Sequence, residues 1–166
     1  MAKITAEWIE QKRDVKMLSK LITDNRITMI SAPPANGKSS LALASIDEIL
    51  TNYPGKKVMY FDYDAGIHRT KDGLFDKFIN EDLIDAYSVE TTEEHEQYIK
   101  GLKELDNSEN CVVFIDGFQS YVSRMGGEIN DNTTMSLVMN DLKALRSNKK
   151  LTIVLIHHNN KADKFG

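Results

Sequence analysis

Five short apolar runs, separated by segments with apolar residues at helical spacing, dominate the sequence. The first of these runs is rich in branched residues, and the runs are mostly apolar on both faces, which is typical of strands that are buried from both sides. The runs cover residues 26–31, 57–64, 83–89, 111–116 and 151–158. Strands that alternate with helices form a mainly parallel sheet with helices on both of its faces. The sequence therefore predicts an α/β fold built on one such sheet.

The segments between the runs predict the helices that cover this sheet. Residues 38–53 are apolar nearly all round and predict a buried helix, and residues 70–80 predict a short one. Apolar residues recur at helical spacing in residues 91–105 and 135–145. A weaker stripe of the same kind predicts that residues 1–22 form an N-terminal helical segment, ahead of a core domain of residues 23–166. Residues 117–133 are polar and are predicted to form a long loop.

Composition and charge exclude several classes of protein. The chain of 166 residues is long enough for one domain with its own core, and no apolar run approaches the roughly 20 residues of a membrane span. The net charge of −4 argues against binding nucleic acid over the whole surface but leaves a local basic groove open. The one cysteine, Cys111, excludes an internal disulfide framework. We therefore expect a protein of the reducing cytoplasm that has no membrane partner.

Residues 32–39 follow the first strand and read A-x-x-x-x-G-K-S, close to the phosphate-binding pattern G-x-x-x-x-G-K-[ST]. Gly37 lets the backbone fold around a phosphate, Lys38 supplies a positive charge, and Ser39 offers a hydroxyl group to Mg²⁺. Backbone N–H groups at the start of the next helix complete an anion site. The predicted nucleotide-binding residues are Ala35, Asn36, Gly37, Lys38, Ser39 and Ser40. The alternative is a plain strand–turn–helix with an exposed lysine.

Carboxylates follow the second and fourth strands, at the edge of a parallel sheet where ligands bind. Asp62 and Asp64 share one side of their strand, and either could orient or deprotonate a water that attacks a γ-phosphate. Asp64 is the favoured candidate, although both could simply cap the strand end. Asp116 ends the apolar run VVFI, as in a Walker B motif, which holds Mg²⁺ through water. These residues predict that the chain binds a nucleotide together with Mg²⁺.

The fifth strand ends in His157 and His158, and Lys161 follows shortly after. Adjacent histidines without a cysteine or an acidic residue at metal-ligand spacing make a poor zinc site. Next to a nucleotide, a polar strand end of this kind can sense the γ-phosphate and pass its state to a neighbouring loop.

The stretches APPANGKSS, VMYFDYD, VVFIDG and VLIHHNNK, in this order, resemble the RecA-like P-loop ATPases. The similarity is greatest to RepA-type hexameric helicases and related phage and plasmid ATPases. The resemblance implies an all-parallel sheet in the order 83–89, 57–62, 111–116, 151–156, 26–31. It also implies further C-terminal strands beyond Gly166, so that strand 26–31 would be an exposed edge in this chain unless the N-terminal helix or a partner covers it.

The resemblance implies roles for individual residues as well. Asp64 matches the catalytic carboxylate of the family, which is usually glutamate, and His158 lies near the family's γ-phosphate sensor. Lys161 matches a basic finger that reaches into the site of the neighbouring subunit. Such a finger implies a homo-oligomeric ring, for example a hexamer, with ATP between subunits. The loop at 117–133 and the segment after Lys161 fall where the family contacts single-stranded DNA.

Three functions are compatible with these features. The first is a DNA helicase or DNA-remodelling motor in replication or recombination, in which Phe118, Tyr121 and Arg124 could contact bases. The second is a small-molecule kinase, which the few, scattered arginines disfavour because kinases of this class clamp the phosphate with an arginine-rich lid. The third is a nucleotide-dependent switch ATPase without a DNA role.

Overall fold

The computed structural model describes residues 1–13, 16–32, 38–64, 73–128 and 130–158. The helices are α1 (Ala6–Arg13), α2 (Lys38–Asn52), α3 (Gly73–Asn80), α4 (Thr92–Lys103), α5 (Phe118–Arg124) and α6 (Asn132–Lys149), with a short 3₁₀ turn η2 (Ser108–Asn110). The strands are β1 (Ile27–Ala32), β2 (Lys57–Asp62), β3 (Ile84–Ser88), β4 (Cys111–Asp116) and β5 (Thr152–His158). In the described part of the chain, no helix is long and apolar enough to cross a membrane.

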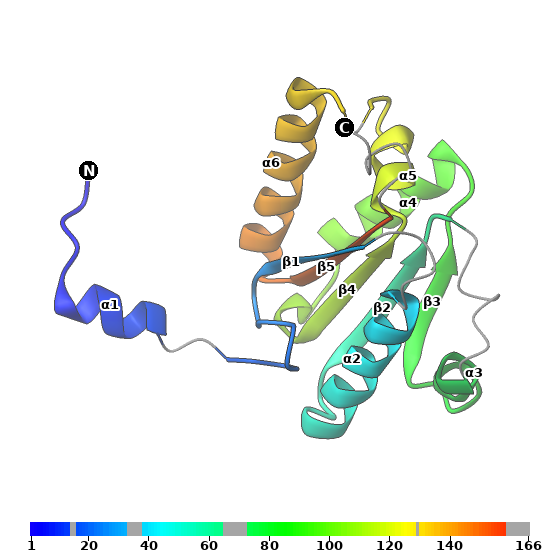
Figure 1. Ribbon diagram of the computed structural model, residues 1–166, viewed down its shortest axis with the longest axis horizontal. Coiled ribbons are helices and arrows are strands. Elements are labelled where there is room, and N and C mark those ends of the chain that lie inside the picture. Colours follow the sequence, from blue (N-terminus) through cyan, green and yellow to red (C-terminus); the bar gives the residue numbers. More distant parts are fainter. Residues whose placement is uncertain (14–15, 33–37, 65–72, 129, 159–166) are drawn as a thin grey trace.

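The five strands form one sheet in the order β1-β5-β4-β2-β3, and every pair of neighbours is parallel (Figure 1). This result confirms the predicted fold class and the strand order that the resemblance implied. The register places Asp62 opposite Asp116 and Asp116 opposite Ile156, while Ala32 lies opposite His158. The carboxyl ends of four neighbouring strands therefore meet at one edge of the sheet.

Each face of the sheet has its own hydrophobic core. On one face, residues of α2 and α3 pack on the strands, and Phe78 and Phe114 are fully buried there. On the other face, residues of α4, α5 and α6 pack around Val113 and Ile153. The predicted arrangement, with apolar strands covered from both sides, is thus confirmed.

The N-terminal segment differs from the prediction. Helix α1 ends at Arg13, and the chain then makes a tight turn that is closed by a bridge between Met17 and Thr23. Leu18 and Ile22 are both fully buried, and the Leu18 N–H donates to the Ile22 carbonyl at 2.8 Å. A spacing of four residues is typical of a helix, but here the turn brings both side chains into the α2 core. The prediction of helix through residue 22 was therefore wrong.

Residues 117–133 are also more ordered than a polar loop. Helix α5 occupies Phe118–Arg124, and Asp131 caps the start of α6 by accepting hydrogen bonds from two backbone N–H groups. Phe118 and Tyr121 are 0% and 2% exposed, because their spacing places them on the face of α5 that packs on the sheet. The prediction that these two rings contact DNA bases was wrong, since a buried ring offers no stacking surface.

Strand β1 lies at the edge of the sheet and pairs only with β5 among the described strands. Met29 in β1 is 45% exposed, so this edge keeps apolar surface in contact with solvent. Helix α1 does not cover it: Figure 1 shows α1 well away from the sheet, and Trp8 on that helix is 44% exposed. The exposed edge that the sequence predicted is therefore present.

Substitution of Phe114 tests the packing at the centre of the sheet. The Phe114 side chain is fully buried in β4, between β2 and β5, and its ring stacks on Tyr60 at 6.0 Å. We expect Phe114→Ala to lower the free energy of unfolding by roughly 3–5 kcal/mol, because the change removes a large side chain and leaves a cavity. Leu137→Ala, at a site that is 61% exposed, should change it by less than about 0.5 kcal/mol. Denaturant unfolding measures both, and equal losses would contradict the proposed core.

Candidate functional site

The polar residues at the ends of three neighbouring strands lie on the face of the sheet that α2 covers. Side chains in a strand alternate between its two faces. The residues that pack in the α2 core are 58 and 60 of β2, 112 and 114 of β4, and 154 and 156 of β5. Asp62, Asp116 and His158 continue this alternation at strand ends that the register aligns. The strand pattern thus directs all three residues to one place.

His157 has the opposite orientation. Its ring stands edge-on to Phe118, with the two ring centroids 6.4 Å apart, on the α5 side of the sheet. Of the histidine pair that the sequence singled out, only His158 joins the two aspartates.

Helix α2 begins at the same edge, because residues 33–37 alone connect the end of β1 to Lys38. The first turn of α2 carries no acidic residue, so no carboxylate of its own helix competes for the free N–H groups. A helix start of this kind attracts an anion such as phosphate. Ser40 is exposed in this first turn. The described part of the chain does not include Ala35, Asn36, Gly37, Lys161 or the side chains of Lys38 and Ser39.

Asp116 is a buried carboxylate that is held from two sides. It is 3% exposed; its Oδ2 accepts a hydrogen bond from the Tyr60 hydroxyl at 2.6 Å, and its Oδ1 lies 3.2 Å from Nε2 of His158. Burial, together with the adjacent Asp116, raises the pKa of Tyr60 well above its usual value. The phenol therefore stays protonated and keeps donating to Asp116, which fixes the direction of the carboxylate.

Asp64 lies just beyond the end of β2, and its carboxylate also faces His158. Its Oδ1 accepts a hydrogen bond from Ser120 at 2.5 Å, and its Oδ2 is 3.6 Å from Nε2 of His158. The backbone N–H of Asp64 donates to Oδ1 of Asp62 at 3.1 Å. Asp62 is 6% exposed, whereas the Asp64 side chain is 35% exposed. Asp62 therefore shapes the turn, and Asp64 presents its carboxylate to the site.

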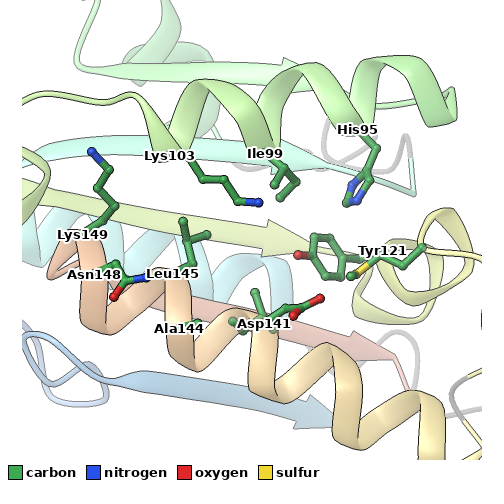
Figure 2. Close-up of a pocket in the computed structure, with 11 residues that line it drawn as sticks. His95, Ile99, Lys103, Tyr121, Asp141, Ala144, Leu145, Asn148 and Lys149 are labelled. Carbon is green, nitrogen blue, oxygen red and sulfur yellow. The ribbon is translucent and has the colours of Figure 1, made fainter.

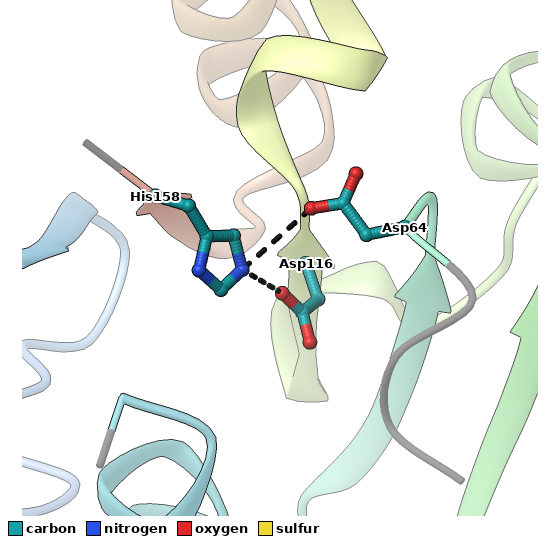
Figure 3. Close-up of side chains that lie close together, drawn as sticks. All are labelled: Asp64, Asp116 and His158. Carbon is teal, nitrogen blue, oxygen red and sulfur yellow. Dashed lines mark hydrogen bonds and ion pairs between the residues drawn. The ribbon is translucent and has the colours of Figure 1, made fainter. Parts of the chain in front are cut away.

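Figure 3 shows Asp64, Asp116 and His158 converging from three strand ends. One ligand atom of each residue lies within 4.8 Å of the others. The two carboxylates fit Mg²⁺, which prefers oxygen ligands and keeps several of its waters. His158 fits a hydrogen-bond donor better than a ligand of that ion. With the start of α2 at the same edge, the residues present suit an anion and its divalent cation.

The sequence analysis missed two residues that position Asp64. Gly117 has φ of +90°, and a Cβ atom there would lie 2.5–2.7 Å from the Asp64 carboxyl atoms. Ser120 follows on the first turn of α5 and bonds Asp64. The glycine directly after the Walker B aspartate was the available signal, because only a residue without Cβ admits both the φ value and the close approach.

Gly117 and Gly126 form a matched pair for testing this contact. Both have positive φ, +90° and +83°, but no atom lies within 4 Å of a Cβ built at Gly126. We expect Gly117→Ala to displace the Asp64 carboxylate and break its bond to Ser120, while Gly126→Ala leaves both in place. Each change should cost roughly 1 kcal/mol of stability, because of the strained backbone. Crystal structures of the two variants show whether the Asp64 carboxylate moves. An unmoved carboxylate in Gly117→Ala would contradict the close approach of Asp64 to residue 117.

Comparisons with known proteins agree with the observed fold. A family model described as an AAA domain matches residues 5–164. Among solved structures, a DnaB-like replicative helicase, described with its interactions with primase, superposes with a TM-score of 0.58 at 14% sequence identity. The match covers 86% of this chain but 41% of that one, so the chain spans less than half of that helicase. No curated protein matches the sequence. The chain belongs to the AAA domain family, with the fold of a RecA-like P-loop ATPase.

Proposed function

We propose that this protein is a Mg²⁺-dependent ATPase that drives a DNA helicase or a related DNA-remodelling machine. The observation that carries the proposal is the convergence of Asp64, Asp116 and His158 at the edge where the phosphate-loop sequence leads into α2. A carboxylate for water, a carboxylate for the metal and a polar sensor are the groups that ATP hydrolysis requires.

The proposed binding roles follow the sequence motif. Backbone N–H groups from Asn36 to Ser40 and the Lys38 ammonium group would hold the phosphates of ATP. The Ser39 hydroxyl group and Asp116, the latter through water, would hold Mg²⁺. The direction of Asp116 suits this role, since Tyr60 occupies one of its oxygens and the other faces the site. The bound Mg²⁺ would neutralise charge that develops on the phosphates.

For hydrolysis we assign the general base to Asp64 rather than Asp62. Asp62 already uses Oδ1 to accept the Asp64 N–H and is nearly buried. Asp64 keeps one oxygen on the side of His158, where it can accept a proton from a water that attacks the terminal phosphorus atom. The bond from that phosphorus to the bridging oxygen breaks, and ADP and phosphate leave. Ser120 orients the base, because its hydroxyl donates to the other oxygen.

His158 and Lys161 are the residues proposed to report the state of the nucleotide. His158 Nε2 lies between the Asp64 and Asp116 carboxylates and can exchange these partners for a phosphate oxygen. Lys161 lies three residues further along the chain and is proposed to reach the site of a neighbouring subunit in a ring. The DNA role rests on the family resemblance and on the helicase with the similar fold.

A switch ATPase without a DNA role is the second candidate. It is favoured by the burial of Phe118 and Tyr121, which removes the aromatic rings that were expected to stack on bases. The net charge of −4 points the same way, because phosphate contacts need a basic surface.

Substitution of the two aspartates tests the catalytic assignment. We expect Asp64→Asn to retain ATP binding but to lower hydrolysis roughly 10²–10⁴-fold, because the amide cannot accept the proton. Asp62→Asn should lower hydrolysis less, since its role is to shape the turn. Phosphate release and binding of a fluorescent ATP analogue provide the two measurements. Lys38→Ala, which should abolish binding, and the remote Asp85→Asn are the controls. A larger loss of hydrolysis in Asp62→Asn would transfer the catalytic role to Asp62.

The effect of DNA separates the two candidate functions. We expect single-stranded DNA to raise the rate of ATP hydrolysis by an ATP-dependent oligomer, because a DNA motor couples turnover to its track. Hydrolysis is measured with and without DNA, alongside the mass of the particle in solution. If Lys161 acts between subunits, the Lys161→Ala variant should still form the oligomer but should hydrolyse ATP slowly. An assembled ATPase whose rate ignores DNA would support the switch and contradict the motor.

A further inference from the structure

A cavity of about 440 Å³ opens between α4 and α6, on the face of the sheet opposite α2 (Figure 2). Its volume is in the range of small-molecule sites. None of its lining residues belongs to the candidate ATP site. The partly buried Ile99 of α4 and the buried Leu145 of α6 give it apolar walls.

Charged groups are distributed unevenly around this cavity. Figure 2 shows Lys149 at one end, His95 and Tyr121 at the other, and Lys103 reaching in from α4. The Lys149 ammonium group is fixed by a hydrogen bond to the Leu105 carbonyl at 3.2 Å and keeps further donors. Within the described residues, Lys103 has no ion-pair partner. Asp141 is the one acidic lining residue, so two lysines against one aspartate leave a single excess positive charge.

His95 supplies a buried polar group that faces the cavity. It is 5% exposed, and its Nδ1 lies 2.7 Å from the Tyr63 hydroxyl. Burial lowers the pKa of His95 and raises that of Tyr63, so the imidazole is neutral and the phenol keeps a proton to donate to Nδ1. Nε2 then carries the ring proton. No residue in the described part of the chain accepts a hydrogen bond from it, and Figure 2 shows the ring pointing into the cavity.

We propose that the cleft between α4 and α6 binds a small monoanion with an apolar body. The apolar body lies between Ile99 and Leu145, and a carboxylate meets the Lys103 ammonium group, which Figure 2 shows directed into the cavity and apart from that of Lys149. Another polar group of the ligand pairs with His95 and Asp141. The single excess positive charge favours a monoanion over a dianion such as a phosphate monoester. This site is independent of the proposed ATPase function.

The test uses 3-(4-hydroxyphenyl)propionate and its methyl ester as probes for the full chain. The pair differs in one negative charge, so the difference in affinity reports the lysines. Isothermal titration calorimetry should show one site per chain, with the acid roughly three- to tenfold tighter than the ester. The ¹⁵N resonances of His95 should shift with the acid, because Nε2 gains a hydrogen-bond partner.

Matched variants locate the probe. Lys103→Gln should remove the preference for the acid, whereas Lys143→Gln, on the exposed side of α6, should keep it. Ala144→Trp should fill the cavity and abolish binding of both probes, whereas Lys143→Trp should not. Ala144 is exposed, so this variant is expected to fold. The proposal is overturned if wild-type protein binds neither probe, binds both equally, or keeps its affinity in Ala144→Trp.

Discussion

The register of the parallel strands is the constraint on which the candidate site depends. Asp62 pairs with Asp116 across β2 and β4, and strand alternation sends the side chains of Asp62, Asp116 and His158 to the face that α2 covers. A shift of one residue in the register of any of these strands would turn its terminal polar side chain toward the other face of the sheet, which α4, α5 and α6 cover. The same alternation buries the apolar residues before each strand end. The hydrophobic core and the polar cluster are therefore positioned by one pattern.

A second layer of contacts then fixes the direction of each polar group. Tyr60 donates to Asp116 from within the core, and Ser120 donates to Asp64 from the first turn of α5. Gly117 allows the Asp64 carboxylate to lie directly against the backbone. Such preorganisation lowers the cost of arranging charges when a ligand binds. The strand ends alone would leave these side chains free to rotate.

The alternation of strands and helices in the sequence was sufficient for a parallel sheet, and the strand ends marked its ligand side. The strand order followed from the family resemblance. The sequence was insufficient where local spacing and tertiary packing disagree. Leu18 and Ile22 have helical spacing but reach the core through a turn, and Phe118 and Tyr121 occupy a polar segment yet are buried. Contacts across long sequence separations, such as Ser120 with Asp64, have no periodic signal.

The most direct test of the candidate site is a crystal structure of the chain with Mn²⁺ and a non-hydrolysable ATP analogue. Anomalous scattering locates Mn²⁺ without ambiguity, and Mn²⁺ accepts the oxygen ligands that suit Mg²⁺. We expect the metal beside Asp116, the triphosphate at the start of α2, and the Asp64 carboxylate facing the terminal phosphate. A metal remote from Asp116, or a nucleotide bound away from α2, for example in the cleft between α4 and α6, would contradict the assignment.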